Sequence, residues 1–125
     1  MKLQYLHNIN EFDEHAVRLS DFNSAQADAF RQVVEELVTG KPDFINLSDL
    51  EFIEEINCSL LLRISEEDTG ITTRDGKDFF CDLTAEGYKD MIRLIEPFCK
   101  KESQSYQWLY ELDVPIGFLF SAGEK

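Results

Sequence analysis

The sequence is poor in basic residues and has no long apolar run. Its 125 residues include 12 Lys and Arg against 25 Asp and Glu, which gives a formal net charge of −13 and a pI near 4.4. A shortage of cations opposes binding to nucleic-acid phosphates and to anionic membrane surfaces. The longest apolar runs, among them 60–62 and 118–120, are far shorter than the roughly 20 residues of a membrane span. We therefore expect neither nucleic acid nor a membrane as a partner.

Cysteine is also scarce, and the familiar catalytic motifs are missing. The three cysteines, Cys58, Cys81 and Cys99, are widely spaced and form no C-x-x-C pair, which argues against a disulfide framework and against a zinc site. The first residues lack the apolar stretch of a secretory signal. G-x-S-x-G, G-x-x-x-x-G-K-[ST], G-x-G-x-x-G and H-E-x-x-H do not occur. We expect a reduced, cytoplasmic protein without a cofactor and, as the favoured hypothesis, without catalytic residues.

What the chain does contain is enough apolar material for one folded domain spanning 1–125. Apolar residues make up 43% of it and aromatic residues 12%, which excludes disorder of the whole chain. One helix is predicted after Asn23, which forms a capping-box pattern with Gln26, and it should end at Gly40. A second helix is predicted after the N-cap Thr84. Their expected buried stripes are Phe30, Val33, Val34 and Leu37 in the first helix, and Tyr88, Met91, Ile92, Ile95 and Phe98 in the second.

Short apolar or alternating segments around these helices predict strands. The expected strands lie near 3–6, 17–21, 44–47, 58–64, 71–73, 79–83, 106–112 and 116–120. Residues 48–57 fit either an irregular or extended segment, which we favour, or a short helix capped by Ser48. The element order predicts an α+β fold, with a mainly antiparallel sheet and two helices packed on one face. The aromatic residues Tyr106, Trp108 and Tyr110 are expected in the core rather than at an interface.

A weak internal similarity appears when the chain is compared with itself at an offset of 61 residues. Asp21 then aligns with Asp82, and the first helical stripe aligns with apolar residues of the second helix. One interpretation is a pair of pseudo-symmetric strand–helix–strand halves, 1–61 and 62–122; the other is a chance alignment of two similar units.

Acidic residues are concentrated between Asp43 and Asp68. This window contains eight acidic residues and one basic residue, Arg63. The window therefore accounts for 1 − 8 = −7 of the net charge. Such a surface would attract a basic protein, or it can simply be a solvated face that protects a sheet edge. The favoured hypothesis is a small acidic interaction or regulatory domain, similar in size and charge to inhibitor and immunity proteins. Its candidate partner-binding residues are Glu51, Glu54, Glu55, Glu66, Glu67 and Asp68.

Two alternatives remain open at this stage. In the first, the carboxylates imitate the phosphates of a nucleic acid and occupy the DNA-binding site of another protein. In the second, the chain is a small metal-dependent enzyme that uses the loop from His7 to His15. The candidate metal ligands there are His7, Asp13 and His15, because imidazole and carboxylate groups both bind divalent cations.

Overall fold

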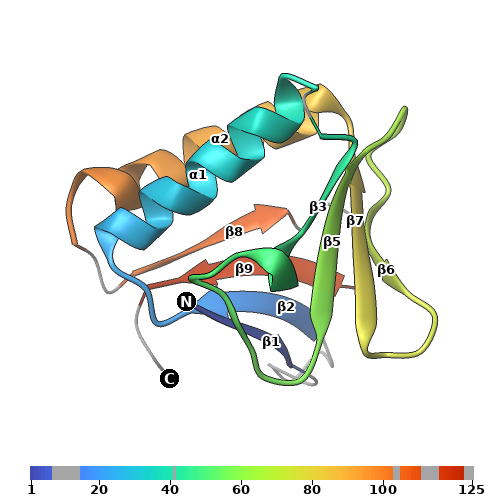
Figure 1. Cartoon of the computed structure of the whole chain (residues 1–125), viewed down its shortest axis with the longest axis horizontal. Coiled ribbons are helices and arrows are strands. Elements are labelled where there is room, and N and C mark those ends of the chain that lie inside the picture. The colour runs from blue at the N-terminus through green and yellow to red at the C-terminus, as the bar shows by residue number, and fades with distance from the viewer. Residues whose placement is uncertain (7–14, 41, 103–104, 111–115, 123–125) are drawn as a thin grey trace.

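The computed structural model describes residues 1–6, 15–40, 42–102, 105–110 and 116–122, and these form an α+β fold. Over this described part, the fold contains two α-helices and nine strands arranged in two mixed sheets. Figure 1 shows the helices side by side above one sheet, with the second sheet standing at their far end. The α+β prediction with two helices is confirmed. Neither of the described helices is long and apolar enough to cross a membrane.

The five-stranded sheet, called sheet A here, has the order β4-β1-β2-β9-β8. Its strands are β1 (Lys2–Leu6), β2 (His15–Ser20), β4 (Glu54–Glu55), β8 (Tyr106–Tyr110) and β9 (Ile116–Ser121). β1 pairs antiparallel with β2, and β8 pairs antiparallel with β9. The two hairpins meet through the parallel pair β2–β9, and β4 adds a short parallel edge beside β1.

The four-stranded sheet, called sheet B, has the order β3-β5-β7-β6. Its strands are β3 (Phe44–Asn46), β5 (Ser59–Ile64), β6 (Gly70–Thr73) and β7 (Asp78–Leu83). The pairs β3–β5 and β6–β7 are antiparallel, and the central pair β5–β7 is parallel. The expectation of a mainly antiparallel sheet is thus met only in part. Local sequence reveals hairpins, whereas the parallel pairs join strands that are not consecutive in the chain.

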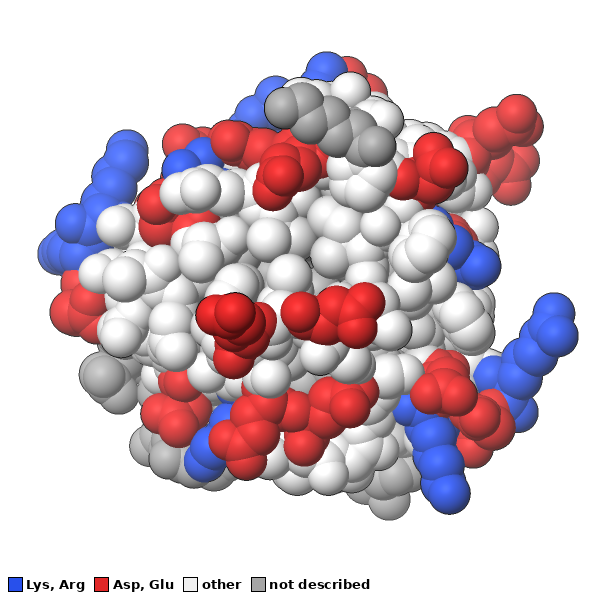
Figure 2. Space-filling view, viewed as in Figure 1, with Lys and Arg blue, Asp and Glu red and all other residues white. Residues whose placement is uncertain are grey.

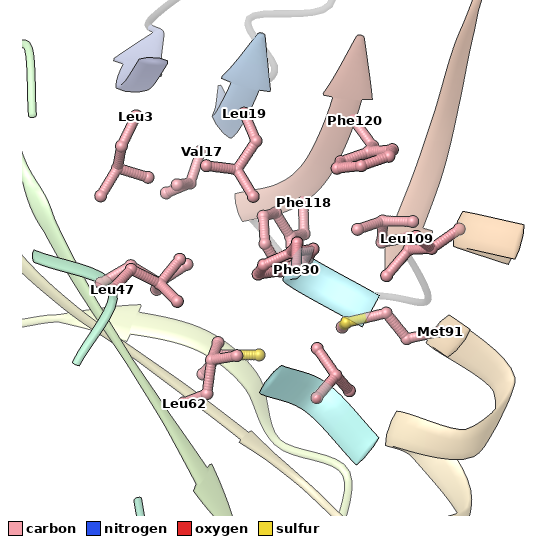
Figure 3. Packing of buried hydrophobic residues seen from close by; sticks show 14 of the residues in the cluster. Leu3, Val17, Leu19, Phe30, Leu47, Leu62, Met91, Leu109, Phe118 and Phe120 are labelled. Atoms are coloured by element: carbon pink, nitrogen blue, oxygen red, sulfur yellow. The ribbon is translucent and has the colours of Figure 1, made fainter. Parts of the chain in front are cut away.

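Both helices begin where their capping residues predicted. α1 (Ser24–Val38) has the complete capping box of Asn23 and Gln26, and α2 (Ala85–Lys100) has Thr84 as its N-cap. Gly40 follows α1 with φ +81°, the left-handed conformation that ends a helix at low cost for glycine. The two apolar stripes, except Val33 and with Ile92 only partly buried, pack into one interior, where side chains from sheet A, both helices and sheet B meet (Figure 3). Leu19, Phe30 and Leu62 are fully buried there.

The segment between β3 and β5 is irregular and extended, as favoured from the sequence. A single 3-10 turn, η1 (Leu47–Asp49), precedes the two-residue strand β4. The alternative of a helix capped by Ser48 is wrong. Asn46 supplies the cap instead, because its side chain accepts a hydrogen bond from the backbone N–H of Ser48 at 3.0 Å.

The two halves of the chain have the same topology and exchange strands. Sheet B, read β3-β5-β7-β6, corresponds strand for strand to β8-β9-β2-β1 of sheet A. Each helix crosses between the sheets, since α1 leads from β2 to β3 and α2 leads from β7 to β8. This arrangement divides the chain between Ile64 and Gly70, whereas the expected boundary after residue 61 lies inside β5.

The offset of 61 residues holds for the helices but not for the strands before them. Asn23 and Thr84 are equivalent N-caps, 84 − 23 = 61 residues apart. Asp21, however, lies in a bend with φ +56°, whereas Asp82 lies within β7. The alignment of these two aspartates is therefore a coincidence of sequence, because the β2–α1 connection has an extra bend that the β7–α2 connection lacks.

Candidate functional site

The six candidate acids are all exposed, but they fall into two groups at opposite ends of β5. Glu51, Glu54 and Glu55 precede this strand, and Glu66, Glu67 and Asp68 follow it. Six residues of strand span about 17 Å, so the two groups do not touch. Figure 2 shows acidic side chains spread over the visible face, with Lys and Arg mainly at its margins. The acidic window of the sequence is thus not one continuous cluster.

The first group is fixed to the edge of sheet A. The backbone N–H of Glu54 donates to the carbonyl of Met1 at 2.8 Å, and β4 pairs with β1 through Lys2 and Leu3. The carboxylate of Glu55 accepts a hydrogen bond from the hydroxyl of Ser48. These contacts hold the segment in place while both glutamate side chains remain at the surface.

In the second group, Asp68 has a structural role that the sequence did not reveal. Its Oδ1 accepts from the backbone N–H of Thr84 at 2.8 Å and from the Thr84 hydroxyl at 2.9 Å, so it supports the first turn of α2. The carboxylate lies close to Gly87, where an added Cβ would come within 2.7 Å of Oδ1. Its backbone carbonyl accepts from the Tyr110 hydroxyl at 3.1 Å. Glu66 and Glu67 are the freely projecting acids of this group.

Between the two acidic groups lies a sheet face that sequence reasoning did not single out. Leu60 and Leu62 of β5 point into the core, so the alternate residues Leu61 and Arg63 point outward. The strand register extends this outer face of sheet B to the neighbouring strands. It comprises Phe44 and Asn46 of β3, Ser59, Leu61 and Arg63 of β5, Asp78, Phe80 and Asp82 of β7, and Thr72 of β6.

This outer face has an apolar centre and one ordered ion pair. Phe44 is 55% exposed, although it is a large aromatic residue. The guanidinium of Arg63 binds both carboxylate oxygens of Asp82, at 2.7 and 2.8 Å, and lies 4.6 Å from the centre of the Phe80 ring. The Asp82 hydrogen bond raises the pKa of Arg63 further, which keeps the guanidinium charged. The alternation of side chains along β5 and β7 could have indicated that Leu61, Arg63 and Phe80 share one outer face. Because β5 has apolar residues on both faces, the sequence did not show which face is outside.

The expectation that the aromatic residues of β8 fill the core is wrong for Tyr106 and Trp108 and holds in part for Tyr110, which is partly buried and packs against the core. Leu109 is the buried residue of this strand, and Tyr106 is 66% exposed. The Trp108 ring lies over Gly117, because an added Cβ there would approach ring atom Cζ3 to 2.7 Å. The register of β8 against β9 shifts between Trp108 and Tyr110, so the regular alternation of side chains is interrupted there. Tyr110 packs against the core, whereas Tyr106 and Trp108 do not belong to it.

The metal hypothesis rests largely on residues that the structure does not describe. His7 and Asp13 lie outside the described residues. His15 begins β2, where its Nδ1 lies 3.1 Å from the Tyr5 hydroxyl and its ring stacks against the Tyr5 ring. Within the described ranges, no group of three His, Cys, Asp or Glu side chains is arranged to hold a metal ion.

The cysteines are free thiols whose surroundings favour the protonated form. Cys58 and Cys81 are buried, and desolvation raises the pKa of each to about 12. Desolvation also raises the pKa of Cys99, which is partly exposed on α2. Since the thiolate is the reactive form, none of the three resembles an activated nucleophile.

The described surface also contains a small groove between α2 and the edge strand β8. Its volume is about 310 Å³, and its lining includes Asp68, Gly87, Asp90 and Leu94 opposite four consecutive residues of β8. A second, shallower hollow brings Glu55, Asn57 and Ser59 together with Lys77 and Asp78. This hollow shows that Glu55 lies beside the end of sheet B where β7 begins.

Comparison with known proteins gives no relative: no family model, no curated protein and no solved structure matches this chain. The function must therefore be argued from the surface itself.

Proposed function

We propose that the chain is a non-catalytic binding domain that recognises a basic protein and regulates or inhibits it. The observation that supports this proposal is the surplus of exposed, uncompensated carboxylates. Among the described residues, the acids that form ion pairs are Asp21, Asp28, Glu35, Asp82, Glu86 and Asp90. Within the described residues, none of the six candidate acids is in such a pair, so their charge is directed to the surroundings.

The physical effect of such a surface is mainly kinetic. A protein with a net charge of −13 attracts a basic partner over a Debye length, about 8 Å at physiological ionic strength. Complementary charge can raise association rates by roughly tenfold or more over the uncharged case, and added salt removes the gain. Like charges repel, so the same surface disfavours association between copies of this chain.

The test begins with capture of the partner. The purified chain is immobilised and exposed to a native lysate at low salt, and proteins released by salt are identified and purified. Association rates are then measured for two charge-reversed variants, Glu54→Lys/Glu55→Lys and Glu66→Lys/Glu67→Lys. Each changes the net charge from −13 to −9, and we expect association with the partner to slow about tenfold at low salt.

The matched control is Glu36→Lys/Glu96→Lys, which makes the same change of charge on exposed positions of the two helices. We expect a much smaller effect from it, because local charge near the contact outweighs distant charge in a screened medium. If all three variants slowed association with the partner equally, the attraction would depend on net charge alone and not on the two acidic groups. Failure to capture any basic protein at low salt would contradict it, and capture of a DNA-binding enzyme through its DNA site would favour the nucleic-acid mimic instead.

A further inference from the structure

We infer that the outer face of sheet B is the docking surface, and that it receives an apolar patch of the partner surrounded by Lys or Arg side chains. The inference rests on the proposed function, since it names the place and the chemistry of the same interaction. It is carried by the juxtaposition of the exposed Phe44, the Leu61–Phe80 pair and acidic groups at both ends of this face.

The centre of the face is built for apolar contact. Leu61 lies opposite Phe80 in the parallel β5–β7 register, and both are only partly buried by the chain itself. Phe44 lies in the next row, opposite Arg63, and more than half of its surface is exposed. Exposed aromatic and aliphatic groups on one sheet face are the usual anchors of protein interfaces, because covering them removes apolar surface from water.

Arg63 gives this centre a fixed shape. Its guanidinium is held by two hydrogen bonds to Asp82 and lies over the Phe80 ring. A side chain that is already ordered loses little entropy when a partner covers it. Because Asp82 neutralises Arg63, the centre presents little net charge and tolerates an apolar partner group.

The rim determines which kind of partner fits. Glu66 and Glu67 follow β5 at one end of the face, and Asp78 begins β7 at the other end. The hollow beside Asp78 includes Glu55, so a member of the first acidic group borders this end of the face, as Glu66 and Glu67 border the other. Lys77 lies in the same hollow, and the acids still outnumber it. A second copy of the chain would bring its own negative rim, so charge complementarity selects a basic partner.

The test uses nuclear magnetic resonance with defined peptides. The probe is a short peptide of alternating lysine and leucine, and its counterpart alternates lysine and serine, so the two differ in apolar content alone. We expect the lysine–leucine peptide to shift the backbone amide signals of Phe44, Leu61 and Phe80, and to bind about tenfold more tightly than the lysine–serine peptide.

Two surface variants locate the contact. Phe44→Ser should weaken binding of the lysine–leucine peptide about tenfold, while Tyr106→Ser, at the other strongly exposed aromatic residue, should leave it unchanged. Both residues are exposed, so neither substitution should unfold the chain. Signal shifts confined to the helices, or equal affinity of Phe44→Ser and the unmodified chain, would overturn the docking surface.

The two proposals fail in different ways. Binding of both peptides elsewhere on the surface would remove the inferred docking face and leave recognition of a basic partner intact. Binding at the face that is insensitive to salt and to Glu66→Lys/Glu67→Lys would keep the face and remove the electrostatic function. Absence of saturable binding by either peptide would overturn the docking inference, and the captured partner would then decide the function.

Discussion

The two helices occupy equivalent places in the two halves of the fold, yet they are tied to their surroundings in different ways. Ala27 of α1 and Tyr88 of α2 lie at the same distance from their N-caps, and both are fully buried. Ala27 offers only a methyl group. The Tyr88 hydroxyl instead lies 2.7 and 2.9 Å from the carbonyls of Cys81 and Arg63, which share its single proton, and it accepts from the Arg63 N–H at 3.1 Å.

The difference shows how one topology can be stabilised by two kinds of contact. Near α1, the Phe30 ring stacks with Phe120 at 5.8 Å between centres and meets Phe118 edge to face. That packing is entirely apolar. Tyr88 instead connects α2 to the backbones of β5 and β7, the parallel pair at the centre of sheet B. At these equivalent helix faces, Phe30 of α1 therefore relies on aromatic packing against β9, whereas Tyr88 of α2 relies on buried hydrogen bonds to sheet B.

The largest expected effect comes from making α2 resemble α1 with Tyr88→Ala. Removing a buried aromatic ring leaves a cavity and should lower the free energy of unfolding by about 3–5 kcal/mol. Tyr88→Phe keeps the ring and removes the hydroxyl, which should cost about 1–3 kcal/mol because backbone groups of Cys81 and Arg63 lose a partner. Urea denaturation followed by circular dichroism measures both values.

The control for the hydroxyl is Tyr106→Phe, at a residue that is mostly exposed. Its free energy of unfolding should stay within about 0.5 kcal/mol of the unmodified chain. A Tyr88→Phe variant as stable as this control would show that the buried hydrogen bonds add nothing, and that α2, like α1, is held by apolar packing.

The same contrast explains how much of the molecule could be predicted from its sequence. The caps Asn23 and Thr84 and the hairpins are local, so short-range patterns were sufficient to find them. The pairing of β2 with β9 joins residues about a hundred positions apart, and no local pattern specifies it. The same limit applies to the surface, because the exposure of Phe44 depends on which strand becomes the edge of sheet B.

Of the candidate site, the sequence revealed the acids but not their grouping. All six are exposed, as a binding surface requires. The sequence did not show which residues lie near these acids in space. β5 separates the two groups, and the pairing of β5 with β7 places Asp78 beside Glu55. Asp68 was counted as a surface charge, although its hydrogen bonds to Thr84 involve a residue 16 positions away.

Alkaline pH should weaken the fold through buried groups in both halves, because the pKa of Cys58 in the first half and that of Cys81 in the second are both raised to about 12. The folded state raises the pKa of Cys81 from its ordinary value of 9.0 to about 12, mainly by desolvation, and burial also raises the pKa of Tyr88. These groups hold their protons more tightly in the folded state. Their contribution to stability is therefore complete below about pH 9 and is lost as the pH rises toward 12.

Urea denaturation at pH 8 and pH 10 measures this loss. We expect the free energy of unfolding to fall by roughly 1 kcal/mol between these values for each of the buried thiols Cys58 and Cys81, and by less for Tyr88, whose ordinary pKa is 10.0. Cys81→Ala should reduce the pH dependence, whereas Cys99→Ala, at a partly exposed thiol, should change it much less. If the free energy of unfolding of Cys81→Ala fell with pH as steeply as that of the unmodified chain, the loss of stability at alkaline pH would come from other groups.

The smallest expected effects on the free energy of unfolding come from removing the N-caps of the two helices, which are built differently. Asn23 and Gln26 complete the cap of α1 between themselves, with hydrogen bonds of 2.9 and 3.1 Å. Thr84 caps α2 by accepting from the Gly87 N–H at 3.1 Å, and its own hydroxyl donates to Asp68. Asn23→Ala should cost about 1 kcal/mol, a typical value for the loss of a cap.

Thr84→Ala should cost somewhat more, because it also removes one of the two hydrogen bonds that hold the Asp68 carboxylate beside α2. The expected sign of that coupling is specific: Asp68→Ala should be less harmful in the Thr84→Ala background than alone, since part of the interaction is already gone. Combining Asn23→Ala with Asp68→Ala provides the matched comparison, and these two effects should simply add. If the changes in unfolding free energy were additive for both pairs of substitutions, the α2 cap would be independent of Asp68, as the α1 cap is. A coupling confined to Thr84 and Asp68 would show that the start of α2 depends on the loop after β5, the loop that also places Glu66 and Glu67 at the rim of sheet B.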